Sequence, residues 1–169
     1  MLSDVLARIT LDSKLGKVRD ILFHQRRIRF KCRRCASLCC RLGGPRLSRQ
    51  DAERIKKAGY DTTDFLDLLN NKPEGGALIC RSLKSRKDGS CIFLRFRPDQ
   101  NRYECSIYDF RPLLCRLYPF DFERKSPNAI LLKLIPCCRG LNDADGESVD
   151  DEFVADHLLA PLLEALESF

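Results

Sequence analysis

The chain has 169 residues, the length of one small domain. Its hydrophobic fraction of 44% and charged fraction of 32% are typical of a folded globular protein and exclude a disordered chain. No apolar run approaches the roughly 20 residues of a membrane span, which excludes an integral membrane protein. Asp4, Arg8 and Asp12 interrupt the N-terminal apolar positions, unlike the unbroken core of a secretory signal, so we expect a cytoplasmic location.

The N-terminal segment is predicted to be helical. Apolar side chains recur at helical spacing from Leu2 to Ile9, and a second stripe begins at Leu15. We therefore expect one broken helix or two helices within residues 1–31.

The middle of the chain is predicted to begin with a helix whose N-cap is Ser48. Asp51 follows three residues later, which is the spacing of a capping box, and Gly59 ends the helix. A short helix over residues 62–70 and a loop over residues 70–76 are expected next.

A β-hairpin is predicted after that loop. Residues 91–96 and 102–108 are strand candidates, and the five residues between them form the connection. Asp109 is expected to cap a short helix that ends at Leu117.

The C-terminal part is predicted to contain a strand over residues 130–135 and a final helix. This helix is expected to start near Ser148, with Asp151 as its capping partner, and to be kinked or broken at Pro161. Its buried face is predicted to consist of Phe153, Val154, Leu158, Leu162 and Leu166.

Together these elements predict an α+β fold: a small single domain with a β-hairpin, short helices and cysteine-rich connections around a metal site. We expect an N-terminal helical segment (1–31), a cysteine-cluster metal-binding domain (32–140) and an acidic C-terminal helix (141–169) packed on the same domain.

Charge is distributed unevenly along the chain, whose net charge is +6. Residues 140–169 contain nine acidic and no basic residues, so the first 139 residues carry all 30 lysines and arginines against 15 acids. The densest basic run, 26–34, is either a nucleic-acid patch or a surface covered by the acidic tail. We favour the second interpretation, because only Phe23 and Phe30 lie near enough in sequence to provide aromatic stacking.

Ten cysteines are the most informative feature of the composition. Disulfides would need an oxidising compartment, for which no export signal is visible, and buried free thiols would explain only one or two of them. Metal ligation therefore explains the cysteines best. Thiolates select zinc, cuprous copper or iron–sulfur clusters over magnesium, calcium or manganese.

Spacing divides the cysteines into two groups. Cys32 and Cys35 form a C-x2-C pair, which lets one turn aim two sulfurs at one ion, and Cys39 can add a third. Cys40 is expected to point elsewhere, because successive side chains diverge in an extended segment. The distal group lies on the hairpin, the helix after it and a strand end: Cys91, Cys105, Cys115 and Cys138.

The residues themselves leave the number and identity of the bound groups open. Eight cysteines allow two four-thiolate sites, or one site with free thiols, and both zinc and a [4Fe–4S] cluster suit thiolate ligands. Neither His24 nor His157 adjoins a cysteine, so neither is expected to be a ligand. Several arginines would offset the negative charge of the site and hold the thiols deprotonated: Arg33, Arg34, Arg41, Arg111 and Arg116.

Several sequence blocks resemble a known family. They are Cys32-x2-Cys35-x3-Cys39-Cys40, then Leu47 with Asp51, then Cys91-Ile92-Phe93-Leu94, then Cys105-Ser106-Ile107-Tyr108-x2-Arg111-Pro112-x2-Cys115-Arg116-x-Tyr118-Pro119-Phe120, and Cys138-x-Gly140. Together they resemble the YkgJ-like cysteine-cluster family of zinc- or iron-chelating domains. The resemblance implies metal ligands at Cys32, Cys35, Cys39, Cys40, Cys91, Cys105, Cys115 and Cys138, with Arg111 and Arg116 supporting the site from beside it. Cys80 and Cys137 are additional cysteines by this pattern, although Cys137 could substitute for Cys138.

Three functions are consistent with these features. The one we favour is a metal-binding protein that holds zinc or an iron–sulfur cluster, in one or two sites, with a redox or metal-handling role. The second is a metal-stapled module that contacts nucleic acid or an acidic protein through the 26–34 run; no membrane partner is expected.

The third function is an enzyme, either an oxidoreductase or a relative of flagellin lysine N-methylase, which shares the cysteine cluster. The short chain lacks a glycine-rich strand–loop–helix signature for S-adenosylmethionine, so the sequence leans against catalysis.

Overall fold

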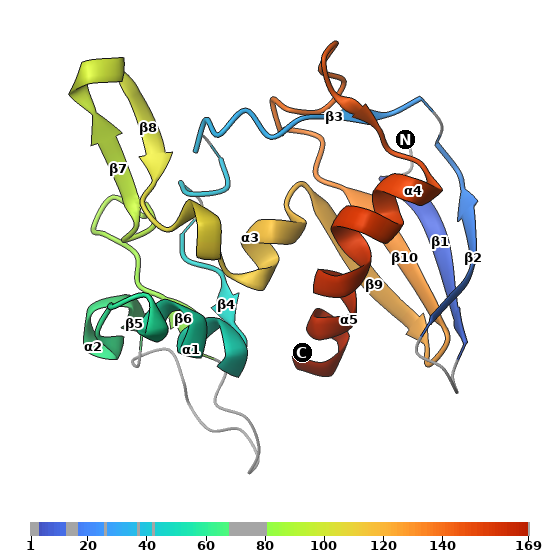
Figure 1. Cartoon of the computed structure of the whole chain (residues 1–169), viewed down its shortest axis with the longest axis horizontal. Coiled ribbons are helices and arrows are strands. Elements are labelled where there is room, and N and C mark those ends of the chain that lie inside the picture. The colour runs from blue at the N-terminus through green and yellow to red at the C-terminus, as the bar shows by residue number, and fades with distance from the viewer. Residues whose placement is uncertain are drawn as a thin grey trace. The chain divides into compact units, whose positions relative to one another are not determined.

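The computed structural model describes residues 4–12, 17–25, 27–36, 38–41, 43–67 and 81–168. It confirms the α+β class, with short helices and a β-hairpin. Contacts group the chain into two compact units (Figure 1). Unit 1 consists of Met1–Arg33 and Leu117–Glu167, and unit 2 of Arg34–Arg116 and Ser168–Phe169. The three segments expected from the sequence stay a prediction.

Unit 1 is built on a four-stranded antiparallel sheet with the strand order β2-β1-β10-β9. Its strands are β1 (Val5–Asp12), β2 (Lys17–Phe23), β9 (Phe120–Ser126) and β10 (Ala129–Leu134). The predicted strand over 130–135 is confirmed, whereas β9 was not anticipated.

The prediction of helices within residues 1–31 is wrong, because the described part of this segment forms β1, β2 and β3 (Arg29–Phe30). The strand β1 lies between two partners, and each pairing has one irregularity: an extra residue in β1 between Val5 and Ala7, opposite β10, and an extra residue in β2 between Val18 and Asp20, opposite β1. Each irregularity breaks the alternation of period two that identifies a strand. The remaining apolar spacing therefore imitates a helix.

The C-terminal helix of unit 1 packs against the sheet, since the centre of the Phe153 ring lies 5.7 Å from that of Phe120 in β9 (Figure 1). It comprises α4 (Asp151–Phe153), a π-helical turn η3 (Val154–Leu158) and α5 (Leu159–Ser168). The expected start near Ser148 is wrong, since Glu147–Ser148 form the strand β11, which pairs with β3. Asp150 is the actual N-cap and accepts a hydrogen bond from the Phe153 N–H (3.1 Å).

Pro161 does not break this helix, contrary to the expectation from the sequence. The wider π turn just before α5 provides an irregularity of the kind that relieves the clash of a proline ring with the preceding turn. The predicted buried face is confirmed at Phe153, Val154, Leu158 and Leu162, whereas Leu166 is half-buried and Ala165 takes the buried position.

Unit 2 begins with β4 (Arg46–Leu47) and α1 (Arg49–Lys57). The capping box of Ser48 and Asp51 is present, and Gly59 has a φ of +98° just after the helix, as the C-terminal stop requires. The predicted helix over 62–70 is shorter: α2 (Thr62–Phe65) leads directly into β5 (Leu66–Asp67).

A small sheet of order β4-β6-β5 includes β6 (Arg81–Leu83). Residues 68–80, which contain Cys80 and the predicted loop over 70–76, lie outside the described residues. Within the described ranges, no helix has both the length and the apolar character needed to cross a bilayer.

The predicted hairpin of unit 2 is confirmed. It consists of β7 (Leu94–Arg97) and β8 (Arg102–Cys105), connected by the 3₁₀ turn η1 (Pro98–Gln100). A second 3₁₀ turn, η2 (Tyr108–Phe110), precedes α3 (Leu113–Leu117). Asp109 lies inside η2 and does not cap α3.

The buried carboxylate of Asp51 supplies the missing cap. One of its oxygens accepts hydrogen bonds from the Leu113 N–H (2.9 Å) and from Arg54, and the other accepts from the Ser48 N–H (3.0 Å). Its side chain is completely buried. Asp51 therefore joins the first turns of α1 and α3, which lie 62 residues apart in the sequence.

Asp51→Asn is expected to lower the free energy of unfolding by about 3 kcal/mol, because an amide NH₂ would face a backbone donor and Arg54 would lose its charged partner. Urea denaturation at fixed metal content measures this change. Glu53→Gln is the matched control: it removes an exposed pair with Arg49 and should cost no more than about 0.5 kcal/mol. Equal effects of the two substitutions would contradict the role of Asp51.

Candidate metal centre

Five cysteines from four segments of unit 2 form what we call the thiol cluster: Cys39, Cys40, Cys91, Cys105 and Cys115. Each has at least one other member among the groups that shift its thiol pKa. All five are free thiols. Segments that are up to 76 residues apart in the sequence therefore bring their thiols close enough to shift one another's pKa.

Backbone hydrogen bonds hold these segments together. The Cys91 N–H donates to the Cys40 carbonyl (2.8 Å), and the Ser106 N–H donates to the Phe93 carbonyl (3.0 Å). In the hairpin ladder Leu94 lies opposite Cys105. Cys115 belongs to α3, whose first turn Asp51 caps.

Arg86, which the sequence analysis did not single out, fixes the turn that contains Cys91. Its guanidinium donates to the carbonyl oxygens of Cys91 (2.9 Å) and Ile92 (2.8 Å). The Asp88 side chain completes the turn by accepting from the Ser90 N–H (3.0 Å) and hydroxyl (2.7 Å). The Asp88-Gly89 dipeptide was the available sequence signal for this turn.

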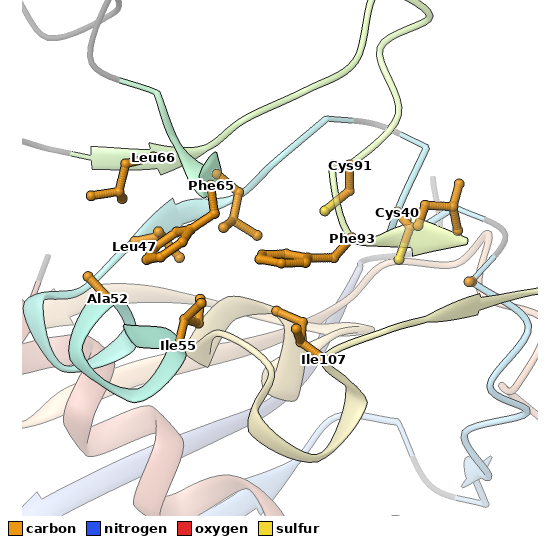
Figure 2. Close-up of a cluster of buried hydrophobic side chains, with 12 residues drawn as sticks. Cys40, Leu47, Ala52, Ile55, Phe65, Leu66, Cys91, Phe93 and Ile107 are labelled. Atoms are coloured by element: carbon orange, nitrogen blue, oxygen red, sulfur yellow. The ribbon is translucent and has the colours of Figure 1, made fainter. Parts of the chain in front are cut away.

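The thiol cluster borders the hydrophobic core of unit 2 (Figure 2). Cys40 and Cys91 lie at one end of this core, and the Phe93 ring extends from beside them toward Phe65. Cys40 and Cys91 are only 7% and 5% exposed, so water has little access to either side chain.

The expectation that Cys40 points away from Cys39 is wrong. Their sulfur atoms lie only 3.8 Å apart, because residues 38–41 form a turn, closed by the Arg41 N–H and the Leu38 carbonyl (3.1 Å), rather than an extended segment. Two sulfurs that each lie about 2.3 Å from one tetrahedral zinc ion are separated by about 3.8 Å. This spacing is compatible with both sulfurs binding one ion.

Hydrogen bonding and charge divide the thiols into two classes. Hydrogen bonding with Cys40 is the main cause that lowers the pKa of Cys39 and of Cys105 to about 7, and the Arg111 guanidinium contributes to this shift. The same hydrogen bonds, together with burial, raise the pKa of Cys40. Burial is the main cause that raises the pKa of Cys91 and of Cys115.

Arg111, one of the two arginines expected beside the site, belongs to a stack on Tyr108. The guanidinium carbons of Arg111 and Arg34 lie 3.8 and 4.1 Å from the centre of the Tyr108 ring, and Arg111 Nε donates to the Tyr108 carbonyl (3.0 Å). This stack orients Arg111. Arg116 follows Cys115 in α3, and its role beside the site stays a prediction.

The remaining predicted ligands are not members of the thiol cluster as defined above. Cys35 belongs to unit 2 and is exposed, whereas Cys32 and Cys138 belong to unit 1. The exposed Cys137 also belongs to unit 1, and Cys80 lies outside the described residues. His157 contacts the Glu147 carboxylate (3.0 Å) rather than a cysteine.

Within unit 1, a close backbone approach joins the segments that carry Cys32 and Cys138. The Lys31 N–H donates to the Gly140 carbonyl (3.0 Å), and a Cβ at residue 140 would lie 2.3 Å from the Lys31 carbonyl oxygen. Only glycine fits there. The Gly140 N–H in turn donates to Cys138 Sγ (3.4 Å), a contact that favours a thiolate.

The chemistry of these donors fits zinc or iron. The cluster offers only sulfur ligands, which select soft ions. The positive charge of Arg111 compensates part of the negative charge of the thiolates. Among the described residues, however, no three potential ligand side chains already converge at the spacing of a bound ion. Binding would therefore have to draw the side chains closer together.

The described unit 1 part of the basic run 26–34 has a partner within the same unit. The acidic segment pairs with it: β11 with β3, Asn142 N–H with the Arg29 carbonyl (2.7 Å), and Arg33 Nε with Asp143 (2.6 Å). The Arg33 hydrogen bond lowers the pKa of the Asp143 carboxyl. The favoured interpretation, an acidic segment folded over the basic run, is thus confirmed for these residues.

Comparison with known proteins gives a family. Residues 31–129 match the CxxCxxCC family, described as a "Putative zinc- or iron-chelating domain". The chain belongs to this family. The matched range contains all five residues of the thiol cluster together with Cys32 and Cys35, and it ends before Cys137 and Cys138.

One similar protein is the uncharacterized protein MJ0661 of Methanocaldococcus jannaschii. It is 32% identical over 145 residues, which cover 83% of this chain and 74% of the relative. No solved structure matches the chain. The family description supports metal binding in general.

In the metal-free chain, alkylation of Cys39 and Cys105 by iodoacetamide is expected to have a midpoint near pH 7, since the thiolate is the reactive form and their pKa values are about 7. Cys91 and Cys115 should react only at higher pH. Mass spectrometry of digested, pulse-labelled protein measures each site.

Arg111→Gln should slow the labelling of Cys39 and Cys105 at pH 7, because loss of the positive charge raises their pKa. Arg95→Gln, on the exposed face of the hairpin, is the control and should change nothing. A single midpoint above pH 8 for all five thiols would contradict the division.

Proposed function

We propose that this protein binds zinc or an iron–sulfur cluster through cysteine thiolates, with a redox or metal-handling role. The thiol cluster supplies ligands, and Cys32, Cys35 and Cys138 are further ligands, in one or two sites. One observation carries the proposal: five free cysteines from four segments interact electrostatically beside an arginine, at the border of a hydrophobic core. A structural role for five buried or half-buried thiols would not require their mutual proximity.

The chain's own residues prepare this site in three ways. Arg111 compensates the negative charge of deprotonated sulfurs, which lowers the free energy of the ligand form. The core side chains around Phe93 limit access of water. Arg86 and Asp51 hold the backbone that carries Cys91 and Cys115.

The bound group would supply different chemistry in the two cases. Zinc in a four-thiolate site contributes folding free energy and has no redox activity, whereas an iron–sulfur cluster transfers electrons. The short distance between the Cys39 and Cys40 sulfurs supports tetrahedral ligation, which zinc prefers and which each iron of a cluster also has.

Anaerobic purification without a metal-affinity tag, followed by measurement of iron, zinc and acid-labile sulfide, tests the proposal. Iron with matching sulfide and a broad absorption band near ~400 nm that dithionite bleaches would identify a cluster. Stoichiometric zinc in a colourless protein would identify a zinc site. Absence of both metals from a folded, reduced protein would contradict metal binding.

Cys105→Ser and Cys115→Ser are each expected to lower the metal content by more than half and to lower the thermal midpoint, because a serine hydroxyl is a poor replacement for a thiolate ligand. Cys32→Ser should have the same effect as a further ligand. Metal analysis and thermal denaturation of the same preparations provide the measurements.

Cys137→Ser and Cys80→Ser are the matched controls, since both residues are additional cysteines by the family pattern. They should retain the metal content of the natural sequence. Equal metal loss from Cys80→Ser would overturn the division between ligand and additional cysteines.

A further inference from the structure

The hydroxyl group of Ser106 is buried without a hydrogen-bond partner. Among the residues that the structure describes, no donor or acceptor lies within hydrogen-bond distance of its Oγ atom. Most buried hydroxyls in folded proteins have a partner, because a buried hydroxyl that lacks one costs free energy. Such a group needs an explanation, and the position of Ser106 in unit 2 provides one.

Ser106 lies between two of the segments that carry the thiol cluster. It directly follows Cys105, and its backbone N–H donates to the Phe93 carbonyl (3.0 Å). Phe93 in turn lies two residues after Cys91. The backbone of Ser106 is therefore hydrogen-bonded to one cysteine-bearing segment while it belongs to another.

The turn that contains Ser106 also donates a hydrogen bond to sulfur. The backbone N–H of Ile107, two residues after Cys105, is hydrogen-bonded to the Cys105 sulfur. The Phe93 N–H, two residues after Cys91, forms the same kind of bond with the Cys91 sulfur. Ser106 is the middle residue of the first of these turns. Its buried hydroxyl thus lies on a segment that curves around a sulfur atom.

Metal binding would change the surroundings of this hydroxyl. In the metal-free arrangement no sulfur atom of the described residues lies within hydrogen-bond distance of Ser106 Oγ, and no three potential ligands among them converge on one point. Binding draws the sulfurs together and makes them thiolates. A thiolate accepts hydrogen bonds strongly, whereas a neutral thiol accepts them weakly. Rotation about one side-chain bond is enough to turn the serine O–H toward such an acceptor.

We propose that the Ser106 hydroxyl donates a hydrogen bond to a metal-bound cysteine sulfur of the thiol cluster and thereby strengthens metal binding. Ser106 is a positioning residue, because it contacts the ligand sulfur and not the metal. This inference rests on the proposed function. The free energy that the metal-free chain loses through the unpartnered hydroxyl is recovered when the metal binds.

Competition for Zn²⁺ between the full-length, metal-free chain and a chromophoric chelator tests the proposal under anaerobic, reducing conditions. Ser106→Ala is expected to weaken zinc binding about tenfold or more, because a ligand sulfur loses its donor. The thermal midpoint of the metal-free chain should stay unchanged or rise, because the substitution removes a buried hydroxyl that had no partner. Ser106→Thr keeps the hydroxyl and should restore the zinc affinity.

Ser90→Ala provides a comparison of opposite sign. Ser90 directly precedes Cys91 and is buried like the Ser106 hydroxyl, but its own hydroxyl donates to the Asp88 carboxylate (2.7 Å). Removal of this partnered hydroxyl should therefore lower the thermal midpoint of the metal-free chain. A drop of the same size in Ser106→Ala would mean that its hydroxyl is structural, and would overturn the proposal.

Co²⁺ in place of Zn²⁺ gives a readout that is specific to sulfur. A hydrogen bond lowers the energy of the sulfur lone pairs, so its loss in Ser106→Ala should shift the sulfur-to-cobalt charge-transfer absorption to longer wavelength. Ser90→Ala should leave this absorption in place. Unchanged zinc affinity and an unchanged cobalt spectrum in Ser106→Ala would overturn this inference alone. A natural-sequence chain that binds neither zinc nor an iron–sulfur cluster would overturn the proposed function with it.

Discussion

The buried carboxylate of Asp51 is the constraint on which the architecture of unit 2 depends. A carboxylate without partners would be very costly in this position, so the fold must bring the Ser48 and Leu113 amides and the Arg54 guanidinium to it. Meeting that requirement fixes the start of α3 relative to the start of α1. Cys115 lies two residues beyond Leu113, and its position in the thiol cluster is set by the same carboxylate.

The thiol cluster combines two opposing requirements. Metal ligands must be able to lose their protons, whereas burial in an apolar environment favours the neutral thiol. The structure meets the two requirements unevenly. The pKa of Cys40 is raised, whereas hydrogen bonding with Cys40 and the charge of Arg111 lower the pKa of Cys39 and of Cys105. Such a set is poised for an incoming cation, because a positive ion would replace the Cys40 proton as the shared partner of these sulfurs.

Local signals were sufficient to predict α1 and the hairpin, and bulges were the cause of the main failure. The capping box at Ser48 and Asp51 involves residues three apart, and the hairpin involves neighbouring strands, so both can be recognised without knowledge of the tertiary structure. By contrast, β1 pairs with β10 more than 100 residues later, and β1 and β2 each contain one bulge. The sequence also identified the cysteines of the thiol cluster and Arg111. It did not identify Arg86, whose role depends on a turn closed by Asp88, or the hydrogen bond that the Leu113 N–H of α3 donates to Asp51.

The order of the segments in unit 1 has a consequence for synthesis. Unit 2 is essentially one continuous stretch inserted between β3 and β9, whereas the sheet of unit 1 needs strands from both ends of the chain. During translation, β1 and β2 leave the ribosome as a two-stranded ribbon, which is marginally stable at best. They must wait for β10, so unit 2, with its cysteines, can fold and acquire its metal before the first strands find their partner.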